Sequence, residues 1–360
     1  MDKVRIGIIG CGGVANGKHM PNLKKMDAMC EMVAFCDLIP EKAEKAAATY
    51  GIEGADVYTD YRKLLERKDI DCVHVLTPNI AHDFISIDAL NAGKHVMCEK
   101  PMATSYEKAM AMCAAAKKNN KLLTIGYQFR SMLNIQYLHK LAAEGELGDI
   151  YFARCVSNRR RGVPTWGVFL DKEKQGGGPL IDCATHELDW VLWVMNNFEP
   201  VSVYGRTYNY LGRDPATVTN PWYKWNHSKF EVEDAAFAFI TFKNGATVSL
   251  ETSWALNIAD GCRSVFCGTK AGADLMDGVR VNGERDGALW VNTYEVIPQY
   301  RPKFQNEKLT EYEYEMKQWL DAIQNGGTPH VLPEEAAVVS QILEGIYKSA
   351  ETGQVVYFDR

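Results

Sequence analysis

The stretch VRIGIIGCGGVA, residues 4 to 15, decides the fold of the first part of the chain. Its first half is a continuous apolar run, which predicts a strand buried on both faces. Its second half gives the pattern G-x-G-x-x-A through Gly10, Gly12 and Ala15 and opens a helical pattern. Glycines at such a turn let the backbone approach a pyrophosphate, whose charge the helix N-terminus stabilises. The stretch, with Gly13 and Val14, therefore predicts a dinucleotide site; the alternative is a tight structural turn.

More strand-like runs alternate with helical patterns over the next 110 residues or so. The strand-like runs are MVAFCD (32–37), DCVHVLTP (71–78), KHVMCEKP (94–101) and KLLTIGYQ (121–128). PEKAEKAAATYG and SYEKAMAMCAAAKKNN, between them, are typical of helices. Strands that alternate with helices in this way predict parallel βαβ units. We therefore expect an α/β fold whose first domain, residues 1–125, is a doubly wound Rossmann sheet.

Asp37 stands at the end of the second predicted strand. A carboxylate at this place can accept hydrogen bonds from both hydroxyls of an adenosine ribose. It would repel a 2′-phosphate, and the following LIPEK contains no arginine that could bind one. NAD is therefore favoured over NADP. Asp37 lies further from the glycines than the usual spacing of about 20 residues, which a longer first helix and loop would absorb.

After about residue 150 the pattern changes to longer runs in which apolar and polar residues alternate. The run DAAFAFITFKNGATVSLETSW, residues 234–254, contains KNGA between two such segments, which predicts a β-hairpin. Residues 126–360 are therefore expected to form a second α/β domain with an open, mostly antiparallel sheet. Helical patterns near 309–326 and 333–353 close the chain, and these last helices could alternatively pack on the first domain.

The composition excludes several classes of protein. The 360 residues are 46% apolar and 24% charged, with a net charge of −6, which argues against a nucleic-acid or anionic-membrane surface. No apolar run is long enough for a membrane span, and the N-terminal residues show no export signal. We expect a cytoplasmic protein whose ten cysteines are free thiols. Cys262 and Cys267 have a zinc-like spacing, but a lone pair on a predicted strand does not favour a metal site.

Two polar motifs follow the third and fourth predicted strands. TPNIAH contains Thr77, Asn79 and His82, and CEKP contains Glu99 and Lys100. Ligands bind outside the carboxyl ends of strands in an open parallel sheet. These residues are therefore candidates for cofactor contacts, with ordinary loop capping as the alternative.

The segment GGGPLIDCATHELDW, residues 176–190, spaces Asp182, His186 and Asp189 four and three residues apart. On a helix opened by Asp182 these side chains would share one face. Such a set could bind a metal, move protons or form a satisfied part of the core. The three glycines before it are expected to let a loop pass close to cofactor and substrate.

Together, the N-terminal GxGxxA, AGKHVMCEKP and GGGPLIDCATHELD resemble the Gfo/Idh/MocA oxidoreductases over nearly the whole chain. The resemblance implies a homo-oligomeric NAD(P)-dependent enzyme that acts on a sugar, cyclitol or glycoside. It implies a catalytic set of Lys100, Asp182 and His186. It also implies that residues 126–130 line the nicotinamide and the substrate. The implied cofactor contacts are Gly10, Gly12, Asp37, Asn79 and Glu99. We add Gly13, Val14, Thr77, His82, Lys100 and Gln128 as further candidate cofactor contacts.

The substrate contacts implied are Lys100, Tyr127, Arg130, Asp182 and His186; residues 158–166 resemble the family least, so we expect Arg159 and Trp166 there to contact the substrate and set its specificity. A histidine that titrates near neutrality suits removal of a hydroxyl proton, and Lys100 would stabilise the negative charge that develops on the oxygen. Lys100 would also oppose a cation, so we expect no metal. The run Arg159–Arg161 predicts a solvated face or a substrate arginine, and the aromatic residues from Trp166 to Trp225 form either core or a sugar-stacking platform.

Three functions compete. The first is an NAD-dependent dehydrogenase of a secondary alcohol in a sugar, cyclitol or glycoside, narrowed by analogy to oxidation of a glucopyranoside at C3. The second is a glycosidase that uses tightly bound NAD to oxidise, eliminate and reduce again. The third is a non-enzymatic sensor of NAD or sugar. Intact Lys100, Asp182 and His186 argue against the sensor.

Overall fold

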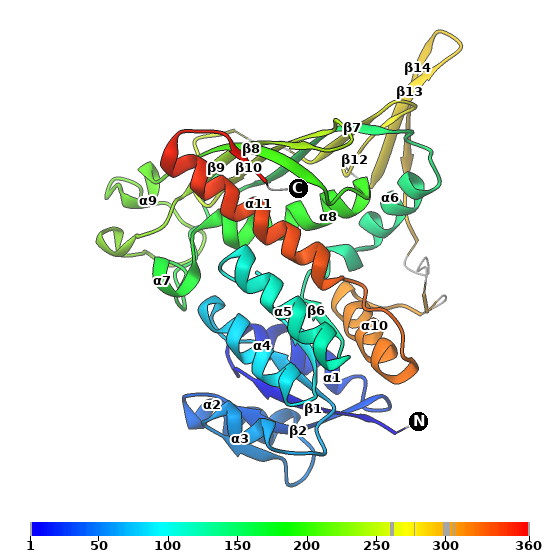
Figure 1. Cartoon of the computed structure of the whole chain (residues 1–360). Coiled ribbons are helices and arrows are strands. Elements are labelled where there is room, and N and C mark those ends of the chain that lie inside the picture. The colour runs from blue at the N-terminus through cyan, green and yellow to red at the C-terminus, as the bar shows by residue number, and fades with distance from the viewer. Residues whose placement is uncertain (1, 260–262, 277, 298–302, 305–306, 359–360) are drawn as a thin grey trace. The chain divides into compact units, whose positions relative to one another are not determined.

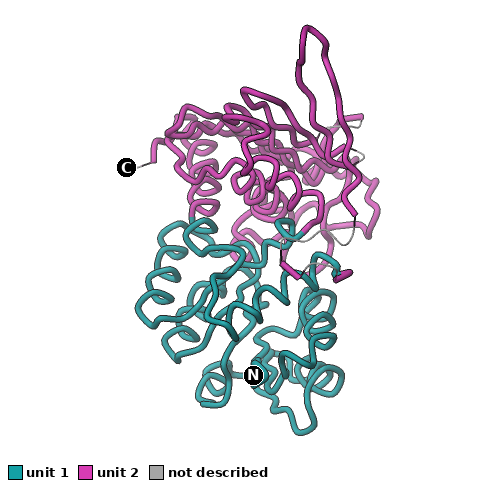
Figure 2. The backbone as a smooth tube through the Cα atoms, turned by 90° about the vertical axis from the view of Figure 1, so that its right-hand side faces the viewer, with its two compact units in different colours: residues 1–131, 309–337 teal, residues 132–308, 338–360 magenta. Residues whose placement is uncertain are grey.

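The computed structural model divides the chain into two compact units (Figure 2) and describes residues 2–259, 263–276, 278–297, 303–304 and 307–358. Unit 1 comprises Met1–Ser131 and Leu309–Ala337, and unit 2 comprises Met132–Lys308 and Val338–Arg360. Unit 1 thus extends past residue 125 and takes in a segment from near the C-terminus. No helix within the described ranges is long and apolar enough to cross a membrane.

Unit 1 is built on a six-stranded, wholly parallel sheet in the order β3-β2-β1-β4-β5-β6. This confirms the predicted Rossmann sheet, whose strand order reverses between β1 and β4. The strands are β1 (Val4–Ile9), β2 (Cys30–Cys36), β3 (Asp56–Tyr58), β4 (Cys72–Val75), β5 (His95–Cys98) and β6 (Leu123–Ile125). The sequence did not predict β3, because this three-residue edge strand is half exposed and lacks an apolar run.

Helices surround this sheet (Figure 1): α1 (Met20–Lys24), α2 (Pro40–Tyr50), α3 (Tyr61–Leu65), α4 (His82–Asn91), α5 (Tyr106–Asn119) and α10 (Glu311–Asn325). Although α10 is distant in sequence, Met316, Trp319 and Leu320 on it are buried in the same core as β1 and β2. Thr310 and Glu313 form a capping box at its start, and Gly326 ends it with a positive φ of 65°. The second sequence segment of unit 1 is therefore an integral part of its core.

Unit 2 is built on a nine-stranded sheet in the order β14-β13-β12-β11-β7-β10-β9-β8-β15. Among the strand pairings of the described residues, that of β7 with β10 alone is parallel, which confirms the predicted, mostly antiparallel sheet. The predicted hairpin is β9–β10, with Gly245 at a φ of 85°. The strands are β7 (Ile150–Asn158), β8 (Pro200–Tyr208), β9 (Ala235–Phe242), β10 (Thr247–Ser253), β11 (Val265–Gly268), β12 (Gly272–Asp274), β13 (Val279–Arg285), β14 (Ala288–Tyr294) and β15 (Val356–Tyr357).

One face of this sheet is covered by helices, among them α8 (Thr185–Met195) and the unit 2 part of α11 (Pro333–Thr352) (Figure 1). The backbone of α11 approaches β8 closely: a Cβ on Gly205 would lie 2.8 Å from Ile346, and one on Gly345 would lie 2.9 Å from Val203. The remaining helices are α6 (Leu133–Ala143) and the short α7 (Lys172–Gln175) and α9 (Tyr210–Arg213). The opposite sheet face carries exposed Tyr151, Tyr204 and Phe239.

Candidate active site

The glycine turn after β1 has the shape that a pyrophosphate requires. Gly10 has a φ of 95°, and a Cβ there would lie 2.6 Å from the Leu76 carbonyl oxygen. A Cβ on Gly12 or Gly13 would meet nothing within 4 Å, so the backbone of this turn is open on its outer side. A π-helical turn (Ala15–His19) follows and continues into α1. The open turn and helix N-terminus fit a dinucleotide phosphate, and Val14 beside them is partly exposed.

Asp37 directly follows β2 and is fixed by backbone donors. Its Oδ2 accepts from the Cys11 N–H at 2.8 Å, and its Oδ1 accepts from the Ile39 N–H at 2.9 Å. Each carboxylate oxygen can accept a further hydrogen bond, which suits the two hydroxyls of a ribose. The helix that ends at Lys24 and a turn over residues 25–29 account for the long spacing from the glycines.

The loops after β4 and β5 are joined to each other by His82. Its Nδ1 lies 2.8 Å from the Pro101 carbonyl oxygen and its Nε2 lies 2.8 Å from the Thr77 carbonyl oxygen. His82 therefore uses both ring nitrogens to hold two loops together, and its role as a cofactor contact stays a prediction. Thr77 fits that expectation better, because its Oγ1 is buried and has no hydrogen-bond partner among the described residues. Asn79 is buried on the same loop.

Glu99 lies at the centre of a buried network of charged and polar groups in unit 1. Its Oε1 accepts from Lys18 Nζ at 2.9 Å and from His19 Nε2 at 2.8 Å, and its Oε2 accepts from the Lys100 backbone N–H at 3.1 Å. Lys18 also contacts the Glu315 carboxylate at 3.0 Å and the Gln128 amide oxygen at 3.2 Å. Glu99 and Gln128 thus bind protein groups, and sequence analysis missed Lys18, His19 and Glu315.

Electrostatics determine the protonation of this network. Burial lowers the pKa of Lys18, but the Glu315 and Glu99 carboxylates outweigh burial and raise it overall. Burial raises the pKa of Glu99, and Lys18 and His19 reverse this and hold it well below its usual range. Burial also lowers the pKa of His19, so its neutral ring donates from Nε2 to Glu99. His19 Nδ1 then accepts from His74 Nδ1, 3.0 Å away.

The segment 126–130 is largely buried in unit 1, although Gln128 and Phe129 are only partly buried. Tyr127 is 1% exposed, and Arg130 is fully buried and forms an ion pair with Glu335. A Cβ on Gly126 would lie 3.0 Å from Glu99 Oε1 and 3.2 Å from Lys18 Nζ. A larger residue at this position would therefore crowd the Glu99–Lys18 ion pair. These contacts place Tyr127 and Arg130 in the interior of unit 1, and their role as substrate contacts stays a prediction.

Asp182 and His186 lie on one continuous helical segment of unit 2, and each is 8% exposed. The segment begins before Asp182, with a π-helical turn (Leu180–Ala184) that runs into α8. The prediction that Asp182 opens the helix was therefore wrong. A π-turn contains more residues than an α-helical turn, so the ideal spacing on one face does not apply to Asp182 and His186. Asp189 is fully buried and belongs to the core side of α8.

Asp182 is held by an aromatic donor. Its Oδ2 accepts from Trp254 Nε1 at 3.1 Å, and Arg159 Nη1 lies 4.0 Å from the same oxygen. The Arg159 guanidinium lies 5.6 Å from the Trp222 ring centroid, and the Trp222 and Trp166 rings meet edge to face at 4.9 Å. Trp166 is 51% exposed and Trp222 41% exposed. These four side chains, which we call the tryptophan wall (Arg159, Trp166, Trp222 and Trp254), combine apolar ring faces with a charge beside Asp182.

No group of three or more histidine, cysteine or acidic side chains within the described ranges could hold a metal ion. Of the two cysteines with zinc-like spacing, Cys267 lies on β11 and Cys262 lies outside the described residues.

Comparisons with known proteins agree with this architecture. Residues 4–127 match the model of the oxidoreductase family with an NAD-binding Rossmann fold, Gfo/Idh/MocA, and residues 135–274 match a Gfo/Idh/MocA C-terminal domain. The chain is 35% identical to a D-glucoside 3-dehydrogenase of Escherichia coli (strain K12), over 97% of this chain and 96% of that protein. It is 25% identical to an inositol 2-dehydrogenase of Salmonella typhimurium (strain LT2), over 97% and 95% of the two chains.

A solved structure of a levoglucosan dehydrogenase with NADH and levoglucosan has the same fold, with a TM-score of 0.84 and 22% identity over the full length of both chains. The Rossmann unit, its glycine turn and the relatives define an NAD-dependent dehydrogenase of sugars or cyclitols. The chain belongs to the Gfo/Idh/MocA oxidoreductase family.

Replacing Asp37 tests the contribution of this side chain to NAD selectivity. In Asp37→Ala the predicted acceptor for the ribose hydroxyls is lost, and so is the charge that repels a 2′-phosphate. We expect the Kd for NADH to rise about 10-fold, as loss of charged hydrogen bonds implies, and the preference for NADH over NADPH to shrink. Fluorescence titration with both cofactors measures this, with Glu53→Ala as an exposed acidic control. Unchanged selectivity would contradict the assignment.

Proposed function

We propose that the protein oxidises a glucopyranoside at C3 and transfers the hydride to NAD. The main support is the 35% identity, over 97% of the chain, to a protein named D-glucoside 3-dehydrogenase. The tryptophan wall adds independent support, because apolar ring faces beside a charged donor suit the mixed apolar and hydroxyl surface of a pyranose. Because the family and its relatives define a dehydrogenase, the alternative of a non-enzymatic sensor of NAD or sugar is set aside.

We assign each proposed catalytic residue a role toward one secondary hydroxyl. Bound NAD supplies the hydride acceptor. His186 takes the proton from the hydroxyl as general base. Lys100 donates a hydrogen bond to the same oxygen and stabilises its developing negative charge. Asp182, oriented by Trp254 and Arg159, accepts a hydrogen bond from the substrate. In the reverse direction His186 returns the proton to the alkoxide.

The exposed sheet face of unit 2 supports a proposal on assembly. Tyr151, Tyr204 and Phe239 are between 43% and 56% exposed on that face, and a large apolar patch on a sheet is a natural interface. We propose that the chain forms a homo-oligomer through this face. Light scattering would then give a mass above the 40.4 kDa of one chain, and a monomeric mass at micromolar concentration would reject the proposal.

Activity of variants tests the catalytic assignment. We expect the wild type to reduce NAD with methyl β-D-glucopyranoside, and Lys100→Ala or His186→Ala to lower kcat about 10²–10⁴-fold, the usual contribution of a proton-transfer or charge-stabilising group. Lys118→Ala, an exposed lysine on α5, serves as control. NAD-dependent release of the aglycone from an aryl glucoside without net NADH would instead support the redox glycosidase. Inositols as the preferred substrates would reject the glucoside assignment.

The tryptophan wall predicts a different kinetic effect. Trp166 contributes ring surface at a distance from the groups that react, so Trp166→Ala should raise KM for the glucoside about 10-fold and change kcat little. Leu289→Ala, which removes an exposed apolar side chain on β14, serves as control. A fall in kcat at constant KM would place Trp166 outside the substrate-binding wall.

A further inference from the structure

Glu233 is a buried carboxyl group for which the proposed reaction has no use. It immediately precedes Asp234 and β9, and only 8% of the residue is exposed. None of the described lysine, arginine or histidine residues forms an ion pair with it. Burial raises its pKa, opposed by hydrogen bonds from surrounding groups. A buried carboxyl group without a cation carries a desolvation penalty, so its hydrogen bonds indicate what it does.

Those hydrogen bonds hold the start of the helix that carries Asp182. Glu233 Oε1 accepts from the Leu180 N–H at 3.1 Å and from the Tyr347 hydroxyl at 2.9 Å. The first N–H groups of a helix have no partner within it, and no local side chain caps this one, which follows Pro179. Glu233 therefore caps the helix from a distant part of the chain, where a carboxylate also interacts favourably with the helix dipole.

The glycines before Asp182 leave the space that Glu233 and Tyr347 occupy at the helix start. A Cβ on Gly177 would lie 1.9 Å from the Tyr347 hydroxyl oxygen, and a Cβ on Gly178 would lie 2.1 Å from the Glu233 carbonyl oxygen. Gly176 ends α7 with a φ of 89°. The close approach that Gly177 and Gly178 permit is thus to the chain's own Tyr347 and Glu233, whereas the sequence led us to expect an approach to cofactor and substrate.

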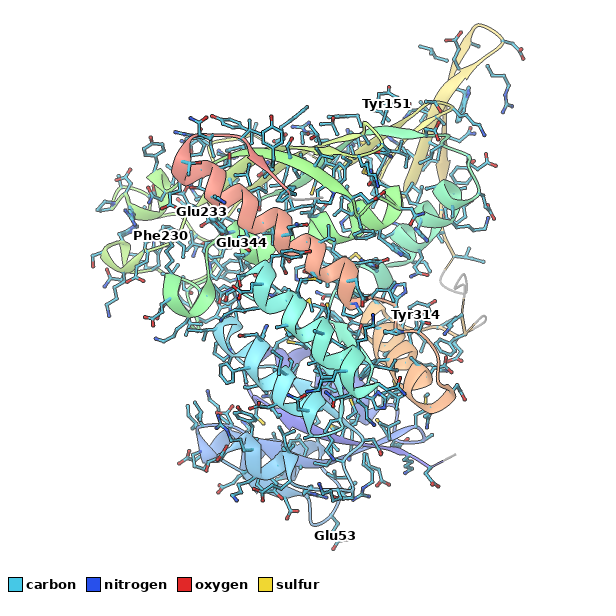
Figure 3. All side chains as sticks on the ribbon, in the orientation of Figure 1. Glu53, Tyr151, Phe230, Glu233, Tyr314 and Glu344 are labelled. Carbon is cyan, nitrogen blue, oxygen red and sulfur yellow. The ribbon has the colours of Figure 1, made fainter. Side chains whose placement is uncertain are left out.

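The same segment fixes Asp182 from a second side. The Asp234 carbonyl oxygen accepts from the Trp254 backbone N–H at 2.9 Å, and the Trp254 indole donates to Asp182. Residues 233–234 therefore hold both the backbone that leads into Asp182 and the ring that orients its carboxylate. Figure 3 shows Glu233 next to α11, the helix that carries Glu344 and Tyr347.

We propose that Glu233 and Tyr347 are positioning residues that set the placement of Asp182 and, through α8, of His186. The proposal rests on the proposed function for the catalytic roles of Asp182 and His186, and on the contacts above for everything else. Neither Glu233 nor Tyr347 needs to touch the substrate. Their effect on rate comes from geometry, since a small displacement of a catalytic group slows the reaction strongly.

Substitutions of Glu233 and Tyr347 separate the loss of the hydrogen bonds from the loss of the charge. In Glu233→Gln a carbonyl oxygen still accepts from Leu180 and Tyr347, so the cap is kept. In Glu233→Ala the Leu180 and Gly178 N–H groups and the Tyr347 hydroxyl lose this acceptor, and Tyr347→Phe removes only the hydroxyl donor. Glu199→Ala removes an exposed carboxylate of unit 2 that forms an ion pair with Lys243 on the surface, and it serves as control.

Steady-state kinetics with methyl β-D-glucopyranoside test the proposal. We expect Glu233→Ala to lower kcat at least about 10-fold, as a misplaced catalytic group does, and to increase the primary deuterium isotope effect on kcat. Glu233→Gln should stay within about 3-fold of wild type, with Tyr347→Phe between the two. The Kd for NADH should not change, because the proposed cofactor residues belong to unit 1.

Hydrogen exchange of the peptide covering residues 176–190 gives a readout that does not depend on activity. Exchange should be faster in Glu233→Ala and unchanged in Glu233→Gln. If the wild type oxidises no glucoside, the proposed function fails, and the exchange data still decide whether Glu233 holds this segment. Unchanged kcat or unchanged exchange in Glu233→Ala would overturn the proposal. So would a general loss of thermal stability and NADH binding, because that identifies a residue needed only for folding.

Discussion

The Lys18 ammonium, buried between the carboxylates of Glu99 and Glu315, is the interaction on which the cofactor unit depends. It joins the helix after the glycine turn, the end of β5 and α10 from the other end of the sequence. A buried carboxylate left without its cation destabilises a protein by about 3–5 kcal/mol, so these three segments must come together. Glu99 in turn accepts from the Lys100 backbone N–H, which fixes the backbone of the residue proposed to act on the substrate oxygen.

In unit 2, too, a buried carboxyl group joins segments that are distant in sequence, but through hydrogen bonds instead of an ion pair. There a buried carboxyl group without a cation, Glu233, accepts hydrogen bonds from a helix start and from a tyrosine. In both units, a buried carboxyl group accepts a hydrogen bond from a backbone N–H at or near a proposed catalytic residue. Glu99 binds the Lys100 N–H, and Glu233 binds the Leu180 N–H, two residues before Asp182. The reacting side chains can then remain partly accessible while their positions are set by groups that the substrate never touches.

The sequence predicted the features that depend on local patterns. Apolar runs located five of the six strands of unit 1, and Asn244-Gly245 located the β9–β10 hairpin. It could not predict β3, whose three residues lack a pattern, or the π-helical turn before α8, which is set by tertiary contacts. Glu233, Tyr347, Lys18 and Glu315 were missed for the same reason. Their partners lie 53 or more positions away in the chain, and no local spacing identifies such pairs.

The account predicts hydride transfer from one specific carbon, and isotope labelling tests this most directly. Wild-type protein would be incubated with NAD and methyl β-D-glucopyranoside that carries deuterium at C2, at C3 or at C4, and the NADH formed would be analysed by mass spectrometry. We predict deuterium in NADH only from the C3-labelled substrate. Deuterium from C2 or C4, or NADH that never contains the label, would contradict oxidation at C3.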